Sequence, residues 1–169
     1  SNGRSLQTHW HTGFAEYLPG DYGDGLVTFA DADFARCLRT RRSVSAHFIL
    51  LNGVLVSWGC KKQPLTALHS SGAELTSLHR AGFKSSLLQS FMSSIGKSFT
   101  TPCTLFEDNK GTINLIRTQR LTDTVRHHDV KLAWLNENFL RGTFLVTYSK
   151  TAMMLVDCCT KPVNGSQLF

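Results

Sequence analysis

The dipeptide Asn52-Gly53 lies between two apolar runs, residues 46–51 and 54–58. Asn-Gly between such runs is the strongest short-range signal of a β-hairpin, because a type I′ turn needs positive φ at both central positions. We therefore predict that the two runs are antiparallel strands. An alternating segment that begins at Leu26 predicts a further strand before them, with Asp31 and Asp33 on the same face.

The remainder of the chain alternates between helical and strand patterns. The expected elements are a long helix that begins near Ser71, its possible N-cap, and ends at Gly96, a strand at 104–106, a small helix over 112–117, a larger helix from about 124 to 141, a strand over 144–148 and a last helix from about Thr151 to Pro162. A hairpin-built half followed by strand–helix units predicts an α/β fold. Its five-stranded mixed sheet, with the first three strands antiparallel, would be flanked by helices.

Composition limits the class of protein. The chain has 169 residues, of which 41% are hydrophobic, and this is enough for one core. It has no apolar run long enough to span a bilayer, and its start lacks the pattern of a signal peptide, so we expect no membrane partner. The net charge of +6 favours a polyanionic partner.

The five cysteines are odd in number and irregularly spaced, without a C-x-x-C pair. This usage predicts a reducing, intracellular location. A zinc site built from Cys158, Cys159 and the pair His127-His128 is disfavoured, because adjacent ligands rarely both reach one tetrahedral ion.

Four carboxylates stand in four distinctive contexts. Asp31 lies in FADADFA, Glu74 in SSGAEL, Asp108 in FEDNKGTI and Asp157 in LVDCCTKP. Mg²⁺ usually binds through a few carboxylates plus substrate phosphate, and two such ions can catalyse displacement at a phosphodiester. A basic chain that carries such an acidic set suggests a nuclease.

Each acid also has a structural interpretation. Ser71 and Glu74 form a capping-box pattern, and Asp108 with Asn109 could cap the helix that follows. Asp31 could be a residue at a strand end, and Asp157 could lie on a solvated helix face. Taken singly, each acid favours the structural interpretation; taken together, the four favour catalysis.

Motifs in the same order resemble those of the ribonuclease H domain of copia-type LTR retrotransposon Pol polyproteins, which also carry a reverse transcriptase. FADADFA is similar to the family's DADWAG box, SWGCKKQ to SWSSKKQ and ALHSSGAEL to ALSSTEAEY. LFEDNKGTI resembles CDNQSAI, and LVDCCTKPV resembles ADILTKPL. VRHHDVK is similar to the family's KHIDIR, but we assign its histidines no catalytic role. The resemblance covers roughly residues 25–165, so that residues 1–24 would be an extension or linker and 166–169 a tail.

The resemblance implies a ribonuclease H-like fold and hydrolysis of the RNA strand of RNA–DNA hybrids. It assigns Asp31, Glu74, Asp108 and Asp157 to catalysis and to the binding of two Mg²⁺ ions, and it favours Asp31 over Asp33. Mn²⁺ would replace Mg²⁺, and no small-molecule cofactor is expected. It also implies a reverse transcriptase domain of the same polyprotein as partner. The location would be cytoplasmic, in a virus-like particle, or nuclear.

Basic and polar residues near the acids are candidate contacts to nucleic acid. Lys61, Lys62 and Gln63 are expected in the loop before the Glu74 helix, where they would contact phosphates without reading base sequence. The same role is expected for Ser71, Asn109 and Lys161, which share motifs with the acids. Trp58 and Trp134 occupy apolar-periodic positions and are expected in the core.

Departures from the family pattern leave an alternative function open. Phe34, Arg36, Gly72 and Leu75 replace the family's Trp, Gly, Glu and Tyr, and Glu107 replaces a cysteine and adds a charge beside the site. These changes motivate a domesticated, non-catalytic module that binds nucleic acid or protein. An integrase-like nuclease is disfavoured, because it would use a three-acid set.

Overall fold

The computed structural model describes residues 25–118 and 129–161. Five strands form one sheet in the order β3-β2-β1-β4-β5. The strands are β1 (Leu26–Asp33), β2 (Val44–Leu51), β3 (Val54–Lys62), β4 (Cys103–Glu107) and β5 (Phe144–Tyr148). The first three strands pair antiparallel, whereas β4 is parallel to both β1 and β5. The predicted mixed sheet is therefore confirmed.

The hairpin between β2 and β3 turns at the predicted dipeptide. Asn52 has a φ of 49° and Gly53 a φ of 78°, as a type I′ turn requires. Strand β3 continues four residues beyond the predicted end at Trp58, because its backbone stays paired with β2 as far as Lys62. Lys61 and Lys62 are thus strand residues, and the prediction of a loop was wrong for them.

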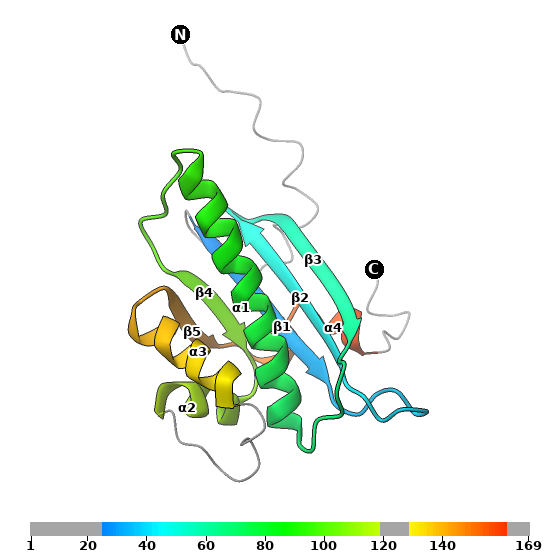
Figure 1. The fold of residues 1–169 in the computed structure, drawn as a ribbon. Coiled ribbons are helices and arrows are strands. Elements are labelled where there is room, and N and C mark those ends of the chain that lie inside the picture. Colours follow the sequence, from blue (N-terminus) through cyan, green and yellow to red (C-terminus); the bar gives the residue numbers. More distant parts are fainter. Residues whose placement is uncertain (1–24, 119–128, 162–169) are drawn as a thin grey trace.

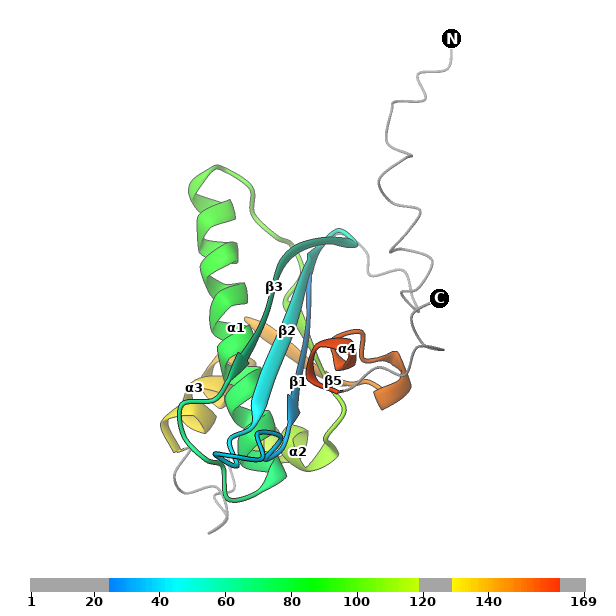
Figure 2. The same ribbon diagram turned by 90° about the vertical axis from the view of Figure 1, so that its right-hand side faces the viewer.

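Helices cover the two faces of the sheet unequally. The helices are α1 (Ser70–Ser94), α2 (Lys110–Thr118), α3 (Asp129–Leu140), the 3-10 helix η3 (Thr151–Met153) and the short α4 (Asp157–Thr160). Figure 1 shows α1 lying along the sheet with α2 and α3 beside it, and Figure 2 shows α4 on the opposite face. None of the described helices is long and apolar enough to cross a membrane.

Two apolar clusters follow from this layering. On the α1 face, Leu26, Ala30 and Ile49 from the sheet pack with residues of all three longer helices. On the other face, Phe29 and Phe48 pack with Met154 and Val156, which lie around η3 and α4. Alternate residues of β1 therefore enter different clusters, which is why both faces of this strand are buried.

Two predictions about tryptophan have opposite outcomes. Trp134 packs against the α1-face cluster, as predicted. Trp58 is 67% exposed, so its assignment to the core was wrong. Trp58 lies on β3, the edge strand of the sheet, where it pairs with Phe48 of β2.

Helix boundaries differ from the predictions at two places. The chain after β5 forms η3 and the four-residue α4 rather than one helix, because Met154 is extended and buried between them. His69, not Ser71, is the N-cap of α1, and its backbone carbonyl accepts from Gly72 and Ala73. The predicted start near residue 124 and the stop at Pro162 lie outside the described residues, as do the segments 1–24 and 166–169.

Candidate metal centre and the adjoining basic pocket

Three of the four acids singled out in the sequence meet at one edge of the sheet. Asp31 lies near the end of β1, and Asp108 directly follows β4. These strands are parallel neighbours, so their carboxyl ends lie together. Glu74 reaches the same point from the first turns of α1. One carboxylate oxygen from each of the three residues lies within 4.8 Å of the other two.

Hydrogen bonds to backbone carbonyls hold α1 in the position that delivers Glu74. The Ser77 hydroxyl lies 2.7 Å from the Asp31 carbonyl and 3.2 Å from the Ala46 carbonyl. On the other side of Glu74, Gln63 Nε2 donates to the Ala73 carbonyl at 2.9 Å. Since the N-cap is His69 and Glu74 Oε2 has no hydrogen-bond partner, the capping interpretation of Glu74 was wrong.

Asp157 joins this group through a cation. It is the first residue of α4, and Lys161 Nζ lies 2.7 Å from its Oδ2 and 3.8 Å from Asp31 Oδ1. Thr160 donates its hydroxyl to Asp31 Oδ2. Asp157 is therefore adjacent to the three-acid set, and Lys161 neutralises part of the negative charge of Asp157 and Asp31.

Asp108 and Asn109 have different roles in the loop between β4 and α2. Asn109 Oδ1 accepts from the Thr112 amide at 3.1 Å, so Asn109 provides the predicted helix cap. Asp108 Oδ2 instead accepts from the Thr151 hydroxyl at 2.7 Å. A hydrogen bond from the connection between β5 and α4 thus orients the Asp108 side chain.

Crowding of buried acids perturbs their protonation. Burial raises the pKa of Asp31, and Asp108 raises it further, against the Thr160 hydrogen bond and the charge of Lys161. Burial, followed by the charges of Glu107, Asp31 and Asp108, raises the pKa of Glu74 to about 10. Burial also raises the pKa of Asp157, which Lys161 opposes.

The group contains a fifth carboxyl that the sequence predicted only as a charge beside the site. Glu107, the last residue of β4, is fully buried. Burial raises its pKa well above the ordinary value, with Asp108 and Asp31 adding to the shift. The family pattern, which has a cysteine at this position, gave no sign that the carboxyl would be enclosed beside Glu74.

These residues suit a hard divalent cation. Every ligand on offer is a carboxylate oxygen, which is the donor that Mg²⁺ and Mn²⁺ prefer. Three buried carboxylate oxygens lack a hydrogen-bond partner within the described part of the chain: Glu74 Oε2, Glu107 Oε2 and Asp157 Oδ1. Such atoms are costly to bury, and a bound cation would satisfy them.

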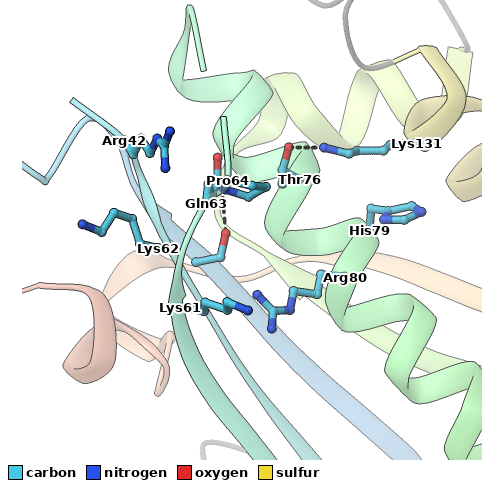
Figure 3. Close-up of a pocket in the computed structure, with 10 residues that line it drawn as sticks. Arg42, Lys61, Lys62, Gln63, Pro64, Thr76, His79, Arg80 and Lys131 are labelled. Atoms are coloured by element: carbon cyan, nitrogen blue, oxygen red, sulfur yellow. Dashed lines mark hydrogen bonds between the residues drawn. The ribbon is translucent and has the colours of Figure 1, made fainter. Parts of the chain in front are cut away.

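A basic pocket of about 520 Å³ lies between the end of β3 and α1, with Lys131 of α3 at its border (Figure 3). None of the described lining residues is acidic. Five of them are cations: Arg42, Lys61, Lys62, Arg80 and Lys131. Thr76 lies two residues after Glu74, and its hydroxyl accepts from Lys131 Nζ at 3.0 Å. The pocket and Glu74 therefore share the first turns of α1, on different sides of the helix.

The predicted contacts to nucleic acid are distributed unevenly. Lys61 and Lys62 are exposed in the pocket, whereas Gln63 is buried and its amide donates within the fold to Ser45 and Ala73. A Cβ placed on Gly111 would lie 3.0 Å from Asn109 Oδ1 and 3.9 Å from Ser71 Oγ. Ser71 and Asn109 thus lie close to each other, at the starts of α1 and α2.

Some residues around the site were missed in the sequence. Thr76 and Arg80 are four residues apart and so share a face of α1, but Glu74 lies on a different face, and helical spacing from Glu74 does not indicate Arg80. Lys131 comes from α3, and no local pattern connects it with Thr76. His127 and His128, considered with Cys158 and Cys159 for zinc, lie outside the described residues.

Comparison with curated proteins finds similarity to transposon polyproteins, although no family model matches. The chain is 26% identical to the Retrovirus-related Pol polyprotein from transposon TNT 1-94 of Nicotiana tabacum over 92% of its length, and 24% identical to that from transposon RE1 of Arabidopsis thaliana over 82%. It spans only 12% and 10% of these relatives. A 56-residue stretch, 33% of this chain and 39% of the other protein, is 45% identical to Secreted RxLR effector protein 161 of Plasmopara viticola.

Solved structures share the architecture at low sequence identity. LC11-RNase H1 in complex with RNA/DNA hybrid superposes with a TM-score of 0.60 at 12% identity, over 80% of this chain and 93% of that one. RNase H1 from Halobacterium salinarum gives a TM-score of 0.54 at 14% identity, over 79% and 92%. The foamy viral protease-reverse transcriptase with RNA/DNA hybrid gives 0.60 at 9%, over 85% and 20%. The chain thus has the ribonuclease H fold and is similar in sequence to copia-type Pol polyproteins.

Proposed function

We propose that this domain is a ribonuclease H that cleaves the RNA strand of RNA–DNA hybrids internally, with two divalent metal ions. The observation that carries the proposal is the convergence of Asp31, Glu74 and Asp108 within 4.8 Å, with Asp157 held beside them through Lys161. Isolated acids that only capped helices or ended strands would not need to share one enclosed site.

In this proposal the four acids bind the ions, and Asp31 is the shared ligand because it is the most buried of the three that converge. Such ions, when bound, activate a water molecule and stabilise charge on the departing oxygen of a phosphodiester. Thr160 and Thr151 orient Asp31 and Asp108 by donating hydroxyl hydrogen bonds. Lys161 balances the charge of Asp31 and Asp157 and would contact a phosphate as substrate binds.

The basic pocket supports a nucleic acid as substrate. Its five cations come from the segment before β2, from β3, from α1 and from α3, and they would contact a phosphate backbone whose scissile bond reaches Glu74. Two structural neighbours, LC11-RNase H1 and the foamy viral enzyme, are named as complexes with RNA/DNA hybrid. We extend this substrate to the present chain, with recognition by helix shape and the 2′-hydroxyl.

A reverse transcriptase domain of the same polyprotein is the partner we propose. The support is the similarity to Pol polyproteins of which this chain spans about a tenth. In that setting the domain would act inside the cell, in a cytoplasmic particle or in the nucleus.

Cleavage by Asp108→Asn tests the function most directly. The variant is nearly isosteric and keeps an oxygen that can accept from Thr151, so the fold should survive. We expect cleavage of a labelled RNA–DNA hybrid in Mg²⁺ by the natural sequence, none in chelator, and a loss of at least about a thousandfold in Asp108→Asn. The matched control is Asp33→Asn, because Asp33 pairs with Arg36 rather than with the acids. Robust cleavage by Asp108→Asn would overturn the assignment.

A second candidate is a module that binds hybrid or protein without cleaving it. The similarity of a third of the chain to a protein named as a secreted effector favours it, since that relative is not a polyprotein by name. If the natural sequence and Asp108→Asn both bind hybrid with equal affinity and neither cleaves, this candidate replaces the enzyme.

A further inference from the structure

The second half of α1 carries a row of exposed apolar side chains. The buried residues of this helix end at Ser85, nine residues before the helix itself ends. Residues four apart lie on one face of a helix, so large apolar residues at every fourth position form a continuous ridge. We call this set the α1 ridge, and its members are 49%, 55%, 59% and 56% exposed, in order: Phe83, Leu87, Phe91 and Ile95.

The α1 ridge is suited to a contact with another segment. Apolar side chains that are exposed singly are ordinary, whereas an aligned row of four marks an interaction surface. At one end of the row, Phe83 contacts Trp134 of α3, with ring centroids 6.1 Å apart. The row then continues along the last turns of α1, away from the packed core. Helices in proteins are stabilised mainly by packing of an apolar face, so these turns need a cover.

Residues 1–24 join the described part of the chain at this same end of the molecule. The start of α1 lies at the carboxyl end of β1, whereas Ser85 Oγ lies 2.7 Å from Oγ1 of Thr28, near the beginning of the strand. Figure 1 shows the C-terminal end of α1 beside the start of β1. A Cβ placed on Gly25 would lie 2.8 Å from Oγ1 of Thr101, which follows α1 by seven residues.

The sequence before Gly25 has an apolar spacing that matches the α1 ridge. Large apolar residues recur there at every fourth position, and Pro19-Gly20, a pair typical of a helix end, follows the last of them. In a helix, either row would span about 18 Å. The chain from residue 18 to residue 25 can extend about 23 Å, which is enough to reach the end of α1. The residues of this second row are Leu6, Trp10, Phe14 and Leu18.

We propose that residues 6–18 dock on the α1 ridge as an amphipathic helix antiparallel to α1. Leu18 would then lie near Ile95, and Leu6 near Phe83, so that two matching apolar rows leave water together. Residues 1–24 contain three acids and one basic residue in a chain of net charge +6, so the segment also complements the charge of the domain. The inference concerns a surface outside the metal centre and does not depend on the proposed function.

Trp10 provides a direct test in the full-length chain. Trp10→Phe keeps an aromatic side chain, so the difference between the emission of the natural sequence and that of the variant isolates Trp10 from the other tryptophans. We expect this emission to be shielded from quenching by acrylamide, compared with free tryptophan. The measurement needs neither metal nor nucleic acid, so its outcome is separate from that of the cleavage assay.

Leu87→Gln should release the segment, because glutamine keeps helix propensity but removes the apolar contact. Measured with and without Trp10→Phe, it should expose Trp10 to acrylamide and lower the melting temperature by about 3–5 °C. Phe91→Gln should do the same and replaces Leu87→Gln if that variant does not fold. The matched control is Leu38→Gln, because Leu38 is 86% exposed and lies between β1 and β2. It should change neither quenching nor melting temperature.

A shielded Trp10 that both ridge variants expose and the control does not supports the inference. Quenching of Trp10 like free tryptophan in the natural sequence overturns it. Shielding that persists in both ridge variants also overturns it, because the segment would then pack elsewhere. Sedimentation of the natural sequence distinguishes a further occupant. Shielding that is lost when a dimer dissociates on dilution would mean that a second copy covers the ridge, and this too overturns docking within one chain.

Discussion

The acidic centre and the basic pocket each include residues of the first turns of α1, but they differ in how their charges are held. Asp31, Glu74 and Glu107 are 2%, 7% and 0% exposed, whereas Lys61 and Lys62 at the end of β3 are exposed. Buried like charges cannot be relieved by water, so the acids depend on a cation or on protons. The lysines keep their hydration, and their contribution is a field that salt screens. In the proposed function the acids would therefore set stability and chemistry, and the lysines would set association.

The largest effect expected from this difference is stabilisation by metal. Millimolar Mg²⁺ or Mn²⁺ should raise the melting temperature by about 5–10 °C, since an ion at a hundred times its dissociation constant adds about 2.7 kcal/mol. Asp31→Asn should lose most of this increase, while Asp33→Asn should keep it. A melting curve that does not respond to metal would contradict an ion-binding acidic centre.

The pH dependence of the metal-free protein is the second test. Glu74 has a folded-state pKa of about 10 against an ordinary value of 4.5, so the folded state holds the extra proton across this window. The contribution of this proton to the free energy of unfolding is fully present below pH 4.5. It is lost as pH rises towards 10, at a slope of at most about 1.4 kcal/mol per pH unit. The raised pKa values of Asp31 and Asp157 act in the same direction.

In chelator, the melting temperature should therefore fall between pH 5 and pH 8, and the fall should be smaller in Glu74→Gln. Saturating Mg²⁺ should remove much of it, because the cation takes the place of the protons. A melting temperature that rises over this range in chelator would show that the acids are not crowded in solution.

The smallest effect concerns the pocket. Lys61→Ala combined with Lys62→Ala should weaken hybrid binding similarly for every sequence and reduce the slope of log affinity against log salt by about 1–2. Metal stabilisation should be unchanged. Binding is measured in chelator, so that cleavage does not interfere.

The control for the pocket is Lys97→Ala with Arg141→Ala, two exposed cations that are not among the pocket residues. It removes the same charge and should leave the salt slope closer to that of the natural sequence. Equal slopes in the two double variants would mean that the net charge, and not this pocket, attracts the hybrid.

Several features of the fold could be predicted because they depend on neighbours in the chain. Asn52-Gly53 specifies its turn through the φ values that only such residues adopt readily, and alternation in 144–148 specifies β5. The contexts of Asp31, Glu74 and Asp108 named three acids that the structure brings together. The choice between Asp31 and Asp33 came from the resemblance, because periodicity places both on one face.

Tertiary structure decided what depends on partners distant in the sequence. Trp58 is exposed because β3 is an edge strand, a fact of sheet order that its own alternation does not contain. Gln63 is buried because its amide bonds to Ser45 and Ala73 across the fold. Glu107 is fully buried at the end of β4, although as a charged residue it would be expected at the surface. Sequence patterns of this chain determine strands, turns and the acids, whereas burial and electrostatic coupling arise from packing between elements, which no local pattern encodes.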